Sequence, residues 1–61
     1  MPHYEINYLN EDGTLACKLD AECGDDTEAK VLAHAMKDRA HKGLEVWDGR
    51  ELVYVRPAEA P

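Results

Sequence analysis

The chain has 61 residues, with 13 aspartates and glutamates against seven lysines and arginines, so its formal net charge at pH 7 is −6. This charge disfavours binding to nucleic-acid phosphates and to anionic membranes. A chain of this length forms one domain with a thin core. We predict a single domain over residues 1–56 and a flexible tail over residues 57–61. The sequence has neither a long apolar run nor a signal-peptide start, so we expect a cytoplasmic protein with reduced thiols.

Two alternating segments near the start predict a β-hairpin. In residues 3–9 the apolar positions share one side, which is typical of a half-buried strand; they are Tyr4, Ile6 and Tyr8. A turn is expected at residues 10–13, followed by a longer strand over residues 14–23. The apolar face of this second strand is predicted to carry Leu15, Cys17, Leu19, Ala21 and Cys23.

A helix is predicted over about residues 26–42, where apolar side chains recur at helical spacing. Asp25 can act as its N-cap, because Glu28 follows three residues later as in a capping box. Cations gather near the other end, where the helix dipole favours them, and Gly43 can follow as the C′ residue. The apolar stripe consists of Ala29, Leu32, Ala33, Met36 and Ala40.

A second hairpin is predicted around a turn at Asp48-Gly49, with Trp47 opposite Arg50. One face of this hairpin would carry Leu44, Val46, Val53 and Val55. The other face would carry Trp47, Leu52 and Tyr54, with Glu45, Arg50 and Arg56. The alternative is a register shifted by a bulge, with Trp47 packed inside and Val46 outside. The predicted fold is therefore α+β: a ββαββ chain whose largely antiparallel four-stranded sheet has one helix packed on one face.

Several segments resemble very short bacterial proteins in families of unknown function, which have about this length and a ββαββ layout. They are residues 1–4 (Met-Pro-His-Tyr), the acidic helix start at 25–29 and the ending at 44–53, with Glu-Val-Trp-Asp-Gly as the most specific part. This resemblance implies a fold and no activity. Residues 22–30 are also similar to the strand-to-helix junction of small antitoxins with a partial RNase H-like fold. This chain departs from those antitoxins, because it lacks their third strand before the helix.

Aromatic, apolar and arginine side chains of the second hairpin are the types that anchor protein interfaces; they are Trp47, Leu52, Tyr54, Arg50 and Arg56. We therefore predict a non-enzymatic interaction module, homodimeric through the sheet face or edge that bears Trp47 and Tyr54, or bound to another protein. The second hypothesis is an antitoxin-like or nucleic-acid-associated regulator with a basic helix flank for an anionic partner. That flank consists of Lys30, His34, Lys37 and His41; the simpler interpretation, which we favour, is that they are solvated side chains.

No catalytic site, metal or cofactor is predicted, because the chain has no serine and no glycine-rich phosphate loop. On one helix, His34 and His41 would stand about 10.5 Å apart, too far to share a metal ion. Cys17 and Cys23 would stand about 20 Å apart along a strand, too far for a disulfide, and we interpret both as buried core thiols. A third hypothesis is a small thiol enzyme that uses Cys23, just before the helix.

Overall fold

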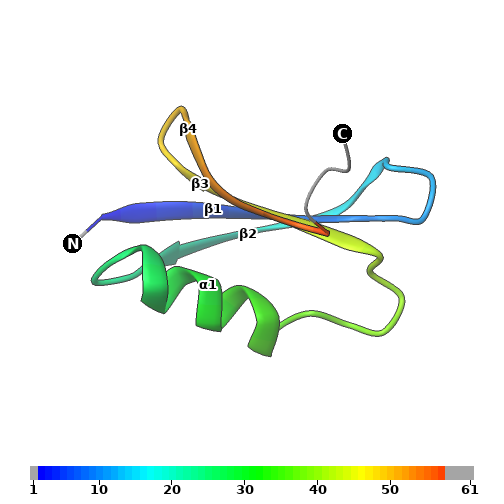
Figure 1. The fold of residues 1–61 in the computed structure, drawn as a ribbon, viewed down its shortest axis with the longest axis horizontal. Helices are drawn as coiled ribbons and strands as arrows, with labels where there is room; N and C mark the ends of the chain where they lie inside the picture. Colours follow the sequence, from blue (N-terminus) through cyan, green and yellow to red (C-terminus); the bar gives the residue numbers. More distant parts are fainter. Residues whose placement is uncertain (1, 58–61) are drawn as a thin grey trace.

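The structure is a computed structural model that describes residues 2–57 and contains four strands and one helix. These elements are β1 (His3–Leu9), β2 (Leu15–Glu22), α1 (Asp26–Ala35), β3 (Gly43–Asp48) and β4 (Glu51–Arg56). The strands form one antiparallel sheet in the order β2-β1-β3-β4, and α1 lies on one side of it (Figure 1). The predicted α+β ββαββ fold is confirmed. Of the predicted flexible tail, residues 58–61 lie outside the described residues.

The strand order places β1 and β3 in the centre of the sheet and leaves β2 and β4 at its edges. Because β1 is antiparallel to both neighbours, β2 and β3 run in the same direction, and α1 connects them. We call the side of the sheet that faces α1 the helix face and the other side the open face. The core lies between α1 and the helix face, and its buried apolar residues are Tyr4, Ile6, Tyr8, Cys23, Ala29, Ala33, Leu44 and Val46.

Asp12 stabilises the turn of the first hairpin. Its Oδ1 accepts hydrogen bonds from the Thr14 backbone N–H at 3.0 Å and from the Thr14 hydroxyl at 2.7 Å. Gly13 has a φ of +89°, which glycine adopts without the steric cost of a Cβ atom. The predicted turn is therefore confirmed, with its backbone groups bonded locally.

A bulge follows this turn and changes the face on which β2 begins. Tyr8 lies opposite Cys17, but Leu9 lies opposite Leu15, so Ala16 is the extra residue. Residues opposite each other in an antiparallel pair share a face. Leu15 therefore lies on the open face, 53% exposed, and the prediction that it shares a face with Cys17 is wrong.

The start of α1 is as predicted, but its end is not. Asp25 is the N-cap, and its Oδ1 accepts a hydrogen bond from the Glu28 N–H at 2.8 Å. The helix ends at Ala35, with Met36 as the C-cap, so the predicted helix to residue 42 is wrong. Ala40, which was assigned to the apolar stripe, is exposed in the segment after the helix.

Hydrogen bonds in the segment 36–42 explain this early end. The Asp38 carboxylate accepts from the Ala40 N–H at 2.9 Å, and the Asp38 carbonyl accepts from the His41 N–H at 3.0 Å. Short acidic side chains compete in this way with the hydrogen bonds of a helix. The Lys42 N–H then donates to the Leu9 carbonyl at 2.8 Å, which aligns the chain along β1.

Two tyrosines of β1 fasten α1 to the sheet. The Tyr4 hydroxyl donates to Asp26 Oδ1 at 2.6 Å in the first turn, and the Tyr8 hydroxyl donates to the Ala33 carbonyl at 2.6 Å near the last. The tyrosines stand about 13 Å apart along the strand, comparable with the rise of about 10.5 Å over seven helical residues. Both tyrosines are buried, and each hydroxyl finds its hydrogen-bond acceptor on the helix itself.

The second hairpin turns one residue later than predicted. Asp48 pairs with Glu51, so the turn residues are Gly49, with a φ of +63°, and Arg50. The predicted pairing of Trp47 with Arg50 is therefore wrong. The two-residue turn itself needs a residue with positive φ, which glycine supplies.

A second bulge decides which residues of β4 face the helix. Trp47 lies opposite Leu52, whereas Val46 lies opposite Tyr54, so Val53 is the extra residue. Leu52 therefore shares the open face with Trp47, while Tyr54 joins Val46 on the helix face. The alternative with Trp47 inside and Val46 outside is wrong, because Val46 is fully buried in the core.

Gly43 is buried at the start of β3 and is not the helix C′ residue that we predicted. A Cβ atom at this position would lie 3.2 Å from the Arg56 carbonyl oxygen and 3.6 Å from Leu9 Cδ1. The first distance is to backbone, which cannot rotate away as a side chain can. Gly43 therefore permits a close approach of β3 to its neighbours.

We predict that Gly43→Ala lowers the free energy of unfolding by about 1–2 kcal/mol, because the added methyl group overpacks the sheet. Urea unfolding followed by circular dichroism measures this change. Gly24→Ala is the matched control, because its Cβ would meet only the flexible Glu28 carboxylate, at 3.3 Å. Equal effects of the two substitutions would contradict the assigned role of Gly43.

We also predict that stability falls as the pH rises above the ordinary tyrosine pKa of 10.0. The hydrogen bond to Asp26, followed by burial, raises the pKa of Tyr4, and burial raises the pKa of Tyr8. As the pH rises, the unfolded chain loses these protons at a lower pH than the folded chain does. The contribution of the two tyrosines to the free energy of unfolding is therefore fully present below about pH 10 and declines above it. Urea unfolding at successive pH values should show this decline, and Tyr4→Phe should make it shallower. Tyr54→Phe is the control, and a wild-type profile that stays flat to about pH 11.5 would refute the prediction.

Candidate functional site

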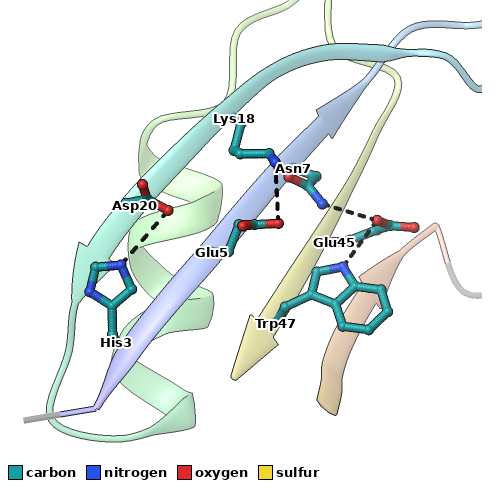
Figure 2. A network of polar contacts seen from close by, with 7 residues as sticks. All are labelled: His3, Glu5, Asn7, Lys18, Asp20, Glu45 and Trp47. Atoms are coloured by element: carbon teal, nitrogen blue, oxygen red, sulfur yellow. Dashed lines mark hydrogen bonds and ion pairs between the residues drawn. The ribbon is translucent and has the colours of Figure 1, made fainter. Parts of the chain in front are cut away.

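The open face of the sheet consists of a charged half on β1 and β2 and an apolar half on β3 and β4. The charged half carries His3, Glu5, Lys18 and Asp20 (Figure 2). The apolar half carries Trp47 and Leu52, as predicted, together with Val55, which lies opposite Glu45. The prediction that Val55 shares a face with Val46 is wrong. Leu52 is 42% exposed at the edge of the sheet.

Glu45 holds the indole of Trp47 at the boundary between the two halves. Its Oε1 accepts hydrogen bonds from Trp47 Nε1 at 3.1 Å and from Asn7 Nδ2 at 3.5 Å (Figure 2). Trp47 is half-buried, and its only polar atom is already bonded within the chain. The exposed part of the ring is therefore apolar surface.

The charged half is organised by an ion pair and by a histidine–carboxylate contact, which is a second ion pair only when His3 is protonated; both remain in water. Lys18 Nζ lies 3.8 Å from Glu5 Oε2, and His3 Nε2 lies 3.8 Å from Asp20 Oδ1, in side chains that are 39–63% exposed (Figure 2). Such exposed pairs contribute about 0–1 kcal/mol each. A partner that covered them would have to remove four polar groups from water, which is unfavourable. The apolar half at β4 is therefore the part of this face suited to contact.

Tyr54 lies on the helix face and not beside Trp47 as predicted. Its hydroxyl lies 2.7 Å from His34 Nε2, and the two rings meet edge to face at 5.6 Å. Lys30 Nζ lies 5.2 Å from the centroid of the Tyr54 ring, close enough for a cation–π contact. Tyr54 therefore packs under α1 and links the helix to the outer strand β4.

The two arginines expected beside Trp47 also lie elsewhere. Arg50 is exposed in the turn between β3 and β4, and Arg56 lies opposite Leu44, which places it on the helix face. The predicted group thus separates: the open face keeps Trp47 and Leu52, and the bulge turns Tyr54 and Arg56 to the other side. Spacing alone could not show this, because a bulge leaves no periodic signal in the sequence.

The predicted basic helix flank is also wrong as a single surface, because α1 ends at Ala35. Lys30 and His34 do lie on the helix beside Tyr54, and Lys37 follows in the next segment. His41 lies instead against β1 and β2, where its ring stacks on Tyr8 at a centroid distance of 4.7 Å. The regulator hypothesis therefore loses the continuous helical stripe on which it was based.

Four basic residues line one hollow of about 390 Å³ on the helix face. They are His34, Lys37, Lys42 and Arg56. The sequence predicts no site role for Lys42, and its alternation predicts Arg56 on the other face of the sheet. No local signal could join residues so distant in the chain, since their meeting depends on the pairing of β3 with β4.

Cys17 is exposed, so its prediction as a buried core thiol is wrong. It lies on the helix face of β2, and its Sγ is 3.8 Å from His41 Nε2. The Asp38 backbone N–H donates to His41 Nδ1 at 3.0 Å, so the neutral ring carries its proton on Nε2, toward the sulfur. The short helix leaves this edge of the sheet uncovered and accessible to solvent.

Cys23 is buried, as predicted, and both cysteines are free thiols. Burial raises the pKa of Cys23, and the charges of Glu28 and Asp25 at the helix start raise it further. The acidic helix start thus opposes the thiolate that a nucleophilic cysteine requires. This environment disfavours the thiol-enzyme hypothesis for Cys23.

We predict that only Cys17 reacts readily with iodoacetamide in the folded protein. Cys23 should react about 100-fold more slowly, because it must first be exposed by local opening of the chain. Mass spectrometry of partially alkylated protein measures both rates. Cys17→Ala should remove the fast adduct and Cys23→Ala should keep it; fast labelling of both cysteines would contradict the structure.

Within residues 2–57, no group of three or more histidine, cysteine, aspartate or glutamate side chains is placed to hold a metal ion. The described part of the chain also has no helix that is long and apolar enough to cross a membrane. No family model, curated protein or solved structure matches this chain in the three comparisons. The resemblances to short bacterial families and to antitoxins therefore stay predictions.

Proposed function

We propose that this protein is a small interaction module that forms a homodimer by antiparallel pairing of β4 with β4 of a second copy. The observation that carries the proposal is the chemistry of this edge strand. Four consecutive apolar or aromatic residues, 52–55, lie between Glu51 and Arg56. An edge strand exposes unpaired N–H and C=O groups, and an apolar one favours association through them.

The opposite edge of the sheet is better protected against such pairing. β2 carries Lys18, Asp20 and Glu22 at alternate positions, which is the usual protection of an edge strand. Both edge strands contain a bulge, so the difference between them lies in the side chains. β4 has no charged residue between its two ends. Its chemistry therefore favours β4 over β2 as the associating edge.

The side chains of β4 are complementary to a second copy of themselves. With the bulge at residues 52–53 counted as one position, a two-fold axis at Tyr54 places Leu52 opposite Val55 of the second copy. Both residues lie on the open face. The same register places Glu51 opposite Arg56 on the helix face, where the opposite charges attract. This match of faces and charges supports pairing with a second copy over pairing with an unrelated strand.

The composition of the open face favours edge pairing over stacking of two open faces. Stacking would bury the ion pairs on β1 and β2, whereas edge pairing leaves them in water. Edge pairing also joins the apolar half of one copy, with Trp47 and Leu52, to that of the next copy. The two apolar halves would then form one apolar surface that continues across the paired β4 strands.

Sedimentation velocity over a dilution series from about 1 mM to about 10 µM tests the proposal. We expect a dimer at the upper concentrations. Glu51→Arg and Arg56→Glu should each weaken it about tenfold by opposing like charges, and the double variant should restore it. A monomer over the whole range, or a double variant weaker than both single variants, would sink the proposal.

Two controls separate association from folding. Leu52→Lys should weaken the dimer, whereas Leu15→Lys, an exposed leucine of the open face on the other edge strand, should not. Within one chain Glu51 lies opposite Asp48, so Glu51→Arg removes a like-charge pair and should not lower the free energy of unfolding. Loss of the dimer without loss of stability is therefore the specific result expected.

A further inference from the structure

The hollow on the helix face combines side chains from three separate segments. His34 belongs to α1, Lys37 and Lys42 to the segment between α1 and β3, and Arg56 to the end of β4. The His34 ring is held by its hydrogen bond to the Tyr54 hydroxyl. The hollow of about 390 Å³ falls in the range of about 300–1,000 Å³ that is typical of small-molecule sites.

The charge of this hollow is opposite to that of the whole protein. Its described lining contains four basic residues and no aspartate or glutamate, in a chain whose net charge is −6. The helix dipole explains cations near the end of α1, which accounts for His34 and Lys37. It does not account for Lys42 and Arg56, which come from other parts of the chain. Like charges that converge in this way repel one another and favour an anion between them.

We infer that this hollow binds the phosphate group of a small molecule. Phosphate oxygens accept hydrogen bonds from guanidinium and ammonium groups, which Arg56, Lys37 and Lys42 carry. A phosphate carries up to two negative charges on several oxygens, so it neutralises more of this cluster than a carboxylate does. The hollow is a single compact site in an acidic protein, which fits a small anion better than an extended nucleic acid.

The inference does not depend on the homodimer, although Arg56 belongs to both surfaces. In the proposed pairing of β4, Arg56 lies opposite Glu51 of the second copy. Lys37 and Lys42 belong only to the hollow, so the test is built on these two residues. Failure of one proposal then leaves the other unchanged.

Backbone amide NMR shifts of the full chain, titrated with inorganic phosphate at constant ionic strength, test the inference. We expect saturable shifts centred on Lys37, Lys42, Gly43 and Arg56, and a smaller response to acetate. The double variant Lys37→Gln/Lys42→Gln should bind phosphate about tenfold more weakly. The matched control Lys18→Gln/Arg50→Gln removes the same charge at exposed positions outside the hollow, and it should bind as the wild type does.

Three outcomes would overturn the inference: no saturable shift, equal loss of affinity in the two double variants, or equal shifts with acetate. Preference for a single-stranded oligonucleotide over phosphate would also overturn it, since it would show a surface for polyanions. Glu51→Arg separates the two proposals, because it should weaken the dimer and keep the phosphate shifts at Lys37 and Lys42. Loss of both together would overturn the inference as stated, because phosphate would then bind only to the dimer.

Discussion

The attachment of a short helix to one side of a four-stranded sheet is the constraint on which the rest of this structure depends. Two buried phenols of the central strand β1, Tyr4 and Tyr8, donate their hydroxyls to the two ends of α1. The small side chains of Ala29 and Ala33 let the helix lie close to them. Because α1 has only ten residues, it covers the centre of the sheet and leaves Cys17 exposed on β2. The reverse side of the sheet has no cover at all within the described chain (Figure 1).

The bulge at Val53 distributes the remaining aromatic side chains over the two faces. A shift of one residue in a strand moves the side chains that follow it to the opposite face. Tyr54 therefore packs under α1 and orients His34, while Leu52 stays beside Trp47 on the open face. Without the bulge, Arg56 would point away from the helix and the hollow would lose one of its four basic residues. The same irregularity thus shapes both the edge strand proposed to associate and the hollow.

The two proposed surfaces meet at the end of β4 but use different parts of the chain. Strand pairing uses backbone groups and the side chains of residues 51–56, and it is driven by the burial of apolar surface. The hollow is lined by basic residues from α1, from the segment between α1 and β3, and from the end of β4. Many of the described acidic residues lie away from the hollow, in the first turn of α1, the hairpin turn at Asp12 and the open face. Within its described residues the lining of the hollow has no carboxylate, which is the basis of the proposed anion site.

The sequence by itself determined the elements whose signals are local: the strand alternation of β1, the N-cap Asp25, the buried helix alanines Ala29 and Ala33, and the order ββαββ. Alternation and capping involve residues within a few positions of one another, so they can be recognised without a fold. The tertiary structure alone decided the end of α1, where Asp38 competes with helical hydrogen bonds and Lys42 joins the ladder beside Leu9. It also decided the two bulges and the presence of four basic residues around the hollow. The bulges depend on the register between paired strands, and the hollow depends on segments that strand pairing brings together; no periodic pattern of side chains records either of them.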